Sequence, residues 1–377
     1  MMACLAAHGV PVEVVCGTTV DAPRDDEPAQ ALAARGLRAM AEGGTIWEAV
    51  GPGAFPVDTP VLRTTASGVP VAILQAPLRP HDEPSERERR GLLDLFDQAV
   101  NRSRPDVLLT YGGDLLTREL LERARHRGIA TVFALHNFAY LGWSDFPVID
   151  AAIVPSEYAA RQYSAAMGLA CAVLPNALDS DRVLVDRREP TYLTFVNPSP
   201  EKGVYPFARI ADELGRERPD IPILVVEGRG GEATVANCGL DLRRHGTVFF
   251  LRNTPDPRRF WSVTRICLIP SLFRETHGMV ATEALANGIP VLASDRGALP
   301  ETLGDAGVTL PLPDHLTPES RHLPSPDEVA PWVKSIVRLW DDLPGRDALG
   351  LRARGRARRW SPERLGPLYA RFFEGLR

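Results

Sequence analysis

Short apolar runs alternate with longer amphipathic stretches along most of this chain. The runs have the length and the flanking turn residues of buried strands, and the stretches between them repeat apolar positions at helical spacing. We predict strands at 11–16, 69–75, 106–110, 131–135, 151–155, 192–196, 222–226, 247–251, 266–269 and 290–293. Strands that alternate with helices indicate βα units around a parallel sheet, which places the chain in the α/β class.

Local signals also define several helices. Residues 115–126 and 205–217 carry apolar positions at helical spacing, and Ser156 is placed to cap a helix over 157–167. Residues 20–65 are rich in Gly, Pro and Ala and have weak periodicity, so the pattern assigns no element to them.

The strands and helices fall into two series, which suggests two domains in a chain of 377 residues. A polar stretch at 175–190 separates the series. Residues 1–8 have the pattern of a helix end that leads directly into the strand at 11–16, whereas a doubly wound domain normally begins with a strand and a glycine-rich turn. We therefore expect the first N-terminal strand to be missing, either because the start codon is assigned too late or because the fold tolerates the loss.

Composition favours a soluble protein of the reducing cytoplasm. Hydrophobic residues make up 44% of the chain, and no apolar run approaches the roughly 18 residues of a membrane span. The N-terminus has no signal-peptide pattern. A net charge of −5 gives no basic field, so we expect no nucleic-acid partner. The five cysteines are scattered without metal-ligand spacing, so we expect no metal site.

The most informative segment is 274–303. We predict a helix at 279–286, ended by Asn287-Gly288. Its first N–H groups, near Gly278, Met279 and Val280, lack intrahelical partners and form an anion site suited to a diphosphate.

Two carboxylates accompany this helix. Glu283 lies in an otherwise apolar helix, and a buried carboxylate needs a partner, which the hydroxyls of a ribose would provide. Glu275 lies in the preceding loop, where it could accept hydrogen bonds from sugar hydroxyls. The structural alternative is that Glu275 caps the helix and Glu283 faces water.

Lys202 and His136 each follow a predicted strand. A lysine beyond the carboxyl end of the strand at 192–196 is placed to meet a phosphate, or it is simply solvated. His136 follows the strand at 131–135, in the other domain, and is either structural or part of the site.

Several of these motifs together carry a family resemblance. They are Glu275-x7-Glu283 with its continuation at 288–307, Pro200-Glu201-Lys202-Gly203, His136-Asn137 with Ala139-Tyr140 and Gly142, residues 154–158 with Pro175-Asn176, and Arg359 to Tyr369. The chain resembles the retaining glycosyltransferases of the GT-B fold, in family 4, the E-x7-E group related to glycogen, starch and sucrose synthases.

The resemblance implies two Rossmann-like domains facing a cleft. Residues 1–178 would form the acceptor-side domain, residues 190–358 would bind the nucleotide sugar, and the C-terminal helix at 359–377 would cross back to the first domain. The implied reaction is a metal-independent hexosyl transfer from a UDP- or GDP-sugar to an unknown carbohydrate, lipid-linked or small-molecule acceptor. Same-face attack through an oxocarbenium-like state would retain the anomeric configuration without an enzymic nucleophile and without a cofactor.

By the same resemblance, Glu275, His136 and Lys202 have catalytic roles. Glu275 would hold the sugar hydroxyls, His136 would contact the sugar from the N-terminal side, and Lys202 would neutralise the departing diphosphate. The implied donor-binding residues are Glu283, His277, Gly278, Met279, Val280, Asn197 and Arg252. Asn197 stands where the family commonly has arginine, so Arg252 or Arg229 would have to supply a second cation.

Other readings remain open. Gly228 to Ala233 fits the dinucleotide pattern G-x-G-x-x-A of a dehydrogenase, although it lies mid-chain. Asp179-Ser-Asp181 fits a metal-binding D-x-D pattern, but a solvated turn is the better interpretation. Five arginines at 352–359 fit either a contact with anionic lipid or a solvated helix. A non-catalytic sugar-nucleotide-binding protein and a nucleotide-sugar epimerase of the same fold are the alternatives to a transferase, and the oligomeric state is undetermined.

Overall fold

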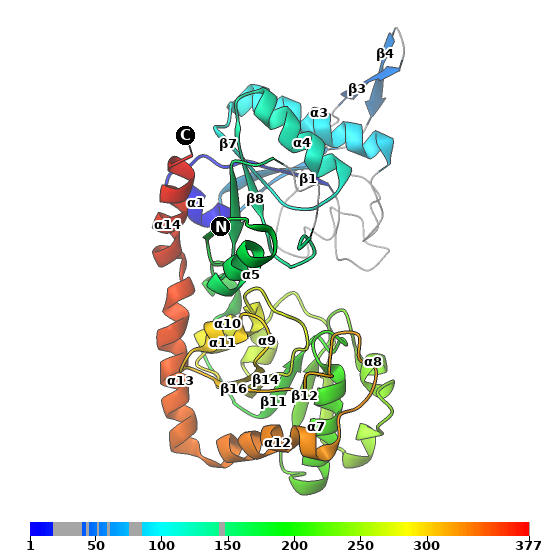
Figure 1. Ribbon diagram of the computed structural model, residues 1–377, viewed down its shortest axis with the longest axis vertical. Coiled ribbons are helices and arrows are strands. Elements are labelled where there is room, and N and C mark those ends of the chain that lie inside the picture. Colours follow the sequence, from blue (N-terminus) through cyan, green and yellow to red (C-terminus); the bar gives the residue numbers. More distant parts are fainter. Residues whose placement is uncertain are drawn as a thin grey trace. The chain divides into compact units, whose positions relative to one another are not determined.

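The structure is a computed structural model that describes residues 1–17, 40–42, 45–50, 53–58, 61–74, 85–142 and 148–376. The chain forms two compact units (Figure 1). The first unit comprises Met1–Leu135, Tyr140–Ile153 and Gly366–Arg377, and the second comprises His136–Ala139 and Val154–Leu365. The domain limits expected from the sequence stay a prediction.

The first unit begins with a helix and contains mostly short strands. Its elements are α1 (Met2–Ala7), β1 (Val14–Gly17), β2 (Met40–Glu42), β3 (Thr45–Val50), β4 (Gly53–Asp58), β5 (Val61–Ala66), β6 (Val69–Leu74), α3 (Glu86–Ser103), β7 (Val107–Thr110), α4 (Leu115–His126), β8 (Ala130–Ala134) and β9 (Ala151–Val154), which ends at the unit boundary. Strands β7, β8 and β9 pair in parallel, as the alternation predicts. Strand β1 pairs in parallel with β6, and β3 and β4 form an antiparallel pair.

Strand β5 corrects the interpretation of this half as wholly parallel. It pairs antiparallel with β6 and with β2. The two-residue loop Ser67-Gly68 joins β5 to β6, and both residues have positive φ, 49° and 80°, which suits the right-handed twist of a hairpin. The sequence prediction missed β5 because the surrounding stretch has no clear period, although Ser-Gly between two apolar runs is itself a hairpin signal.

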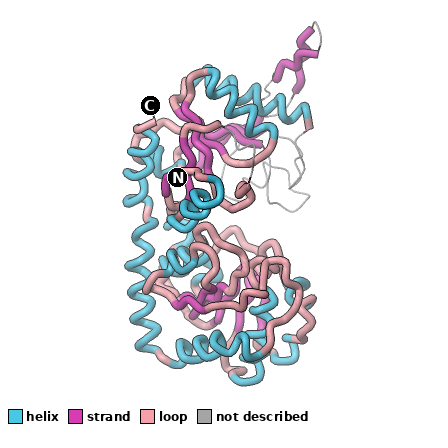
Figure 2. The backbone as a smooth tube through the Cα atoms, in the orientation of Figure 1, coloured by secondary structure: helices cyan, strands magenta, loops and turns pink. Residues whose placement is uncertain are grey.

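The second unit contains a six-stranded parallel sheet with helices around it (Figure 2). Its elements are α5 (Glu157–Met167), β10 (Cys171–Val173), α6 (Ser180–Val183), β11 (Tyr192–Val196), α7 (Val204–Glu217), β12 (Ile223–Val226), α8 (Glu232–Ala236), a 3₁₀ turn (Leu242–His245), β13 (Val248–Leu251), α9 (Arg258–Trp261), β14 (Thr264–Ile269), α10 (Met279–Ala286), β15 (Val291–Ser294), α11 (Leu299–Leu303), β16 (Val308–Leu310), α12 (Pro326–Asp341), α13 (Leu343–Ala357) and a second 3₁₀ turn (Arg358–Trp360). A seventh strand, β10, belongs to the sheet of β7, β8 and β9. Helix α14 (Pro362–Glu374) is the last element and runs into the first unit.

The strand order in the six-stranded sheet is β13-β12-β11-β14-β15-β16. When the six strands of this sheet are numbered in chain order, the order is 3-2-1-4-5-6, which is the order of a Rossmann fold. The strand order reverses between β11 and β14. The core beneath the reversal is well packed, because Phe195 of β11 stacks on Phe207 of α7 with ring centroids 4.4 Å apart, and both side chains are buried. Such a core makes the ends of β11 and β14 a rigid platform for a site.

Most predicted elements of this unit are confirmed. Helices α5 and α10 and strand β11 have the predicted limits, and the Ser156 side chain accepts a hydrogen bond from the Ala159 N–H as the expected cap. Across the described residues, no helix combines the length and the apolar character that a membrane span requires.

Candidate functional site

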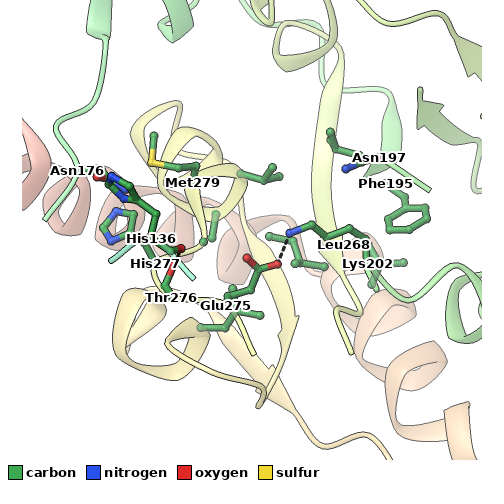
Figure 3. A pocket seen from close by; sticks show the side chains of 16 residues that line it. His136, Asn176, Phe195, Asn197, Lys202, Leu268, Glu275, Thr276, His277 and Met279 are labelled. Atoms are coloured by element: carbon green, nitrogen blue, oxygen red, sulfur yellow. Dashed lines mark hydrogen bonds and ion pairs between the residues drawn. The ribbon is translucent and has the colours of Figure 1, made fainter. Parts of the chain in front are cut away.

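The carboxyl ends of β11 and β14 border a pocket of about 290 Å³ (Figure 3). Ligands of open parallel sheets bind at this kind of position, where the strand order reverses. The lining residues are His136, Asn176, residues 195–197, Lys202, residues 268–269, residues 275–281 and Leu299. All of them belong to the second unit.

The turn after β11 is fixed against the loop after β14. A Cβ atom on Gly203 would lie 1.7 Å from the carbonyl oxygen of Pro270, so only glycine allows this approach. The carbonyl of Glu201 also accepts two hydrogen bonds of 2.9 Å from the backbone N–H groups of residues 272–273. These contacts place Lys202 beside the β14 loop.

Lys202 and Glu275 form an ion pair in this pocket. The Lys202 Nζ lies 2.5 Å from the Glu275 Oε1, which also accepts a hydrogen bond of 3.1 Å from Ser271 Oγ. The Glu275 side chain is 13% exposed and the Lys202 side chain 32% exposed, so both can be reached from the pocket. Glu275 therefore pairs with the lysine and does not cap α10, which excludes one half of the structural alternative.

The start of α10 is open to the pocket. No side chain in the described part of the chain caps this helix, and its N-cap is Gly278. The first intrahelical bond runs from the Thr282 N–H to the Gly278 carbonyl, so the helix itself does not use the N–H groups of residues 279–281. A helix N-terminus of this kind attracts anions.

His136 follows β8 in the chain, yet it lines this pocket. Its carbonyl oxygen accepts a hydrogen bond of 2.7 Å from Thr276 Oγ1. Burial lowers the pKa of the His136 imidazole below its ordinary value, so the ring is neutral at neutral pH.

His277 lines the pocket with a ring that is held by its surroundings. Its Nδ1 lies 3.3 Å from the Pro155 carbonyl oxygen, which has no proton to give, so Nδ1 is the donor. The ring packs edge-on against Trp360, and the His277 carbonyl accepts a hydrogen bond from Thr302 Oγ1. Burial lowers the pKa of His277 to about 4. The ring therefore stays neutral and braces the start of α10.

Glu283 lies outside the residues that line the pocket, one helical turn further along α10. Its Oε2 accepts a hydrogen bond of 3.1 Å from the indole N–H of Trp261, which is fully buried. Burial raises the pKa of the Glu283 carboxyl, while the Trp261 N–H opposes the rise. Trp261 is a partner that the sequence analysis missed, because no local spacing connects it to α10.

Asn197 holds the glycine-rich loop. It has a φ of 61°, and its Oδ1 accepts hydrogen bonds from the Arg229 N–H at 2.8 Å and the Gly230 N–H at 3.3 Å. The N–H groups of Gly231 and Glu232 bond to the side chains of Thr234 in α8 and Glu227 after β12. Because these donors are already used, the stretch 228–233 does not form the phosphate cradle that a dehydrogenase would need.

The second cation that the family resemblance implies does not line the pocket. Arg229 and Arg252 are both exposed, and neither is among the residues that line the pocket. Lys202 is the single lysine or arginine of that lining in the described chain.

Two further motifs have structural roles. The Asp179 side chain caps α6 by accepting from the Arg182 N–H, and no cluster of metal-binding side chains occurs in the described ranges. In the arginine run, Arg352 and Arg356 donate to carbonyl oxygens at 301–305. At least these two arginines pack on the protein surface.

Comparison with known proteins finds a family match within the second unit and several curated relatives of the chain. Residues 190–342 match the family described as "Glycosyl transferases group 1". The chain is 32% identical over 174 residues to a phosphatidyl-myo-inositol mannosyltransferase of Mycolicibacterium smegmatis, covering 43% of this chain and 44% of that protein. It is 28% identical over 216 residues to a GDP-mannose-dependent alpha-(1-6)-phosphatidylinositol monomannoside mannosyltransferase of the same organism, covering 48% and 56%. The chain thus spans about half the length of these curated relatives.

Solved structures extend the similarity to the whole chain. The catalytic domain of starch synthase IV from Arabidopsis thaliana, bound to ADP and acarbose, superposes with a TM-score of 0.64 at 13% identity, covering 97% of this chain and 99% of that one. Sucrose-phosphate synthase from Thermosynechococcus elongatus gives a TM-score of 0.61 at 14% identity with the same coverage. At these identities the likeness shows the fold, which is the GT-B fold of two Rossmann-like domains expected from the sequence.

Proposed function

We propose that this protein is a glycosyltransferase that takes the sugar of a nucleoside-diphosphate sugar bound at the ends of β11 and β14. The observation that carries the proposal is the Lys202–Glu275 pair beside the uncapped start of α10. This arrangement offers a cation and helix N–H groups to a diphosphate, and a carboxylate to the neutral hydroxyls of a sugar.

Each charged group then has one task. Lys202 neutralises the charge that develops on the departing diphosphate, and the N–H groups at the start of α10, with the backbone of residues 277–280, bind its oxygens. Glu275 accepts hydrogen bonds from the sugar hydroxyls. His136 contacts the same sugar through its neutral ring.

The remaining donor contacts lie around the nucleoside. Glu283, held by the Trp261 N–H, accepts from the ribose hydroxyls. Asn197 presents its amide nitrogen to the diphosphate, because its Oδ1 already serves the loop at 229–230. Arg252 joins the donor site only if its exposed side chain swings toward the ligand.

The proposed chemistry is metal-independent and retains the anomeric configuration. The bond between the anomeric carbon and the diphosphate oxygen breaks, and its electron pair leaves with the diphosphate. The acceptor hydroxyl oxygen forms the new bond on the same face through an oxocarbenium-like state, and its proton passes to the departing diphosphate oxygen. The protein contributes position and stabilisation of the leaving charge, which are large terms in catalysis and need no enzymic nucleophile.

The names of the relatives suggest where to look for substrates. One relative is named as GDP-mannose-dependent, and others are named for phosphatidyl-myo-inositol and D-inositol 3-phosphate. We therefore take GDP-mannose as the first donor and UDP-glucose as the second. Inositol phosphates and phosphatidylinositol are the first acceptors.

The test is a transfer assay that measures nucleoside diphosphate release with and without each acceptor. We expect acceptor-dependent release by the unaltered protein, a severe loss in Lys202→Met, and no loss in Lys334→Met, which makes the same change at an exposed site on α12. Release without a glycosylated product, or binding without turnover, would favour an epimerase or a non-catalytic binding protein. Equal activity in both lysine variants would contradict the site.

A further inference from the structure

The segment His136–Ala139 is held by side chains of the second unit, although it directly follows β8. Tyr163 of α5 donates its hydroxyl to the Asn137 carbonyl at 2.5 Å. The guanidinium of Arg274 lies over the ring of Phe138, 5.6 Å from its centroid. These contacts fix residues 137 and 138, and a separate contact acts on His136.

That contact comes from Thr276. Its side chain is buried, and its Oγ1 donates to the His136 carbonyl at 2.7 Å across 140 residues of sequence. Thr276 directly follows Glu275 and lies two residues before the N-cap of α10. Figure 3 shows His136, Thr276 and Glu275 along one wall of the pocket. The Thr276 hydroxyl thus connects the backbone of His136 to the loop that contains Glu275.

The bond joins a buried hydroxyl to the backbone of a residue that is itself exposed. Without this donor the His136 carbonyl loses a protein partner, and the backbone around it is freer to move. A shift of about 1 Å in a group that touches the reacting centre costs on the order of 100-fold in rate. A hydroxyl that holds the backbone of His136 therefore limits where its imidazole can lie.

We infer that Thr276 is a positioning residue that holds the His136 imidazole against the sugar of the bound donor. The inference rests on the proposed function, since it needs a nucleotide sugar in this pocket. Thr276 has no contact with the diphosphate in this proposal. Removing its hydroxyl should therefore weaken only the part of the donor affinity that comes from the sugar.

The test compares binding of GDP-mannose and GDP by calorimetry, with UDP-glucose and UDP as a second pair. The ratio of the two dissociation constants within a pair measures what the sugar adds. Thr276→Val removes the hydroxyl at constant shape, and Thr276→Ser keeps it. Thr194→Val is the matched control, because the Thr194 side chain is also buried and its hydroxyl bonds to Thr264 at 2.9 Å in the sheet, outside the pocket lining.

We expect Thr276→Val to lower the sugar's contribution about tenfold while the dissociation constant of the free nucleoside diphosphate stays within about twofold. Thr276→Ser and Thr194→Val should keep both values. The decisive step is a double-mutant cycle, in which Thr276→Val should have almost no further effect in a His136→Ala background, since the threonine acts through that histidine.

The outcomes distinguish a failure of the positioning role of Thr276 from a failure of the proposed function. Equal losses from Thr276→Val with and without His136 would overturn the positioning role and indicate that the hydroxyl contacts the ligand or the fold directly. An unchanged sugar contribution in Thr276→Val would also overturn it. If the unaltered protein binds none of the four nucleotides, the proposed function itself fails.

Discussion

The ammonium of Lys202 and the carboxylate of Glu275 lie 2.5 Å apart, although 73 residues separate them in the sequence. The two strands that precede them, β11 and β14, are neighbours at the reversal of the sheet, so their carboxyl-end loops meet. The pair holds opposite charges at the place where the proposed ligand has both a diphosphate and a sugar. Binding of a diphosphate must therefore compete with Glu275 for the lysine.

This competition gives the first prediction. Glu275→Gln should raise the affinity for GDP about three- to fivefold, because it breaks this partly buried ion pair and frees Lys202 for the diphosphate. The same variant should lose sugar transfer, since the amide has no charge and only one acceptor oxygen where the carboxylate has two. Glu319→Gln is the control at an exposed glutamate. A fall in the GDP affinity of Glu275→Gln, measured by calorimetry, would contradict the competition between Glu275 and the diphosphate for Lys202.

Asn197 carries the second prediction. Asn197→Asp keeps an oxygen for the N–H groups of Arg229 and Gly230, but it replaces the amide nitrogen by a second, negatively charged acceptor. We expect normal folding and a loss of GDP affinity of about 10- to 100-fold, in line with the loss of a hydrogen bond to a charged group. Affinity for guanosine, which has no phosphate, should not change. Asn237→Asp, exposed after α8, controls for added charge. Equal losses for guanosine and GDP would show that Asn197 only shapes the loop.

Trp261 and Glu283 give the third prediction. Trp261→Phe removes the indole N–H that opposes the raised pKa of Glu283, so the carboxylate becomes a poorer partner for ribose hydroxyls. We expect the affinity for GDP to fall about fivefold. The affinity for 2′,3′-dideoxy-GDP should stay the same, because that ligand lacks the hydroxyls. Trp332→Phe removes an equally buried indole N–H that bonds to the Pro311 carbonyl, and it is the stability control. Equal losses of affinity for GDP and for 2′,3′-dideoxy-GDP would show that Glu283 does not bind the ribose hydroxyls.

His277 gives a prediction on pH. Its pKa is about 4 when folded, against 6.5 for an ordinary histidine, so between these values the unfolded chain binds the extra proton. Stability from this group is complete above pH 6.5 and is lost as the pH falls toward 4. The full effect is about 3 kcal/mol. His277→Phe keeps a ring against Trp360 and should remove this dependence. When the free energy of unfolding is measured with urea, the unaltered protein should therefore lose more of it between pH 7 and pH 4 than His277→Phe does. Equal losses would contradict a neutral, buried His277.

The elements that the sequence predicted best are those with local signals at both ends. Helix α10 has Gly278 before it and Asn287-Gly288 after it, and its predicted limits are confirmed. Helix α5 begins at a serine cap whose side chain makes the expected bond. Propensity and capping act within a few residues, so a single sequence contains the information.

The features that the sequence could not supply depend on three-dimensional packing. The bond between Trp261 and Glu283 joins α9 to α10, and no periodicity connects the two positions. Asn197 was identified as a departure from the family pattern, but its bonds to the loop at 229–230 follow from its positive φ at the strand end. Strand β5 was missed because antiparallel pairing is decided by the partner strand as much as by its own residues.

The most direct test of the central claim is calorimetric titration of the full chain with GDP, UDP, ADP and NAD, in parallel with Lys202→Met and Lys334→Met. We expect that at least one nucleoside diphosphate binds, that Lys202→Met weakens this binding about 10- to 100-fold, and that Lys334→Met does not change it. Binding of NAD alone, or a nucleoside diphosphate that binds equally well to all three proteins, would contradict the assignment of this pocket to a nucleotide sugar.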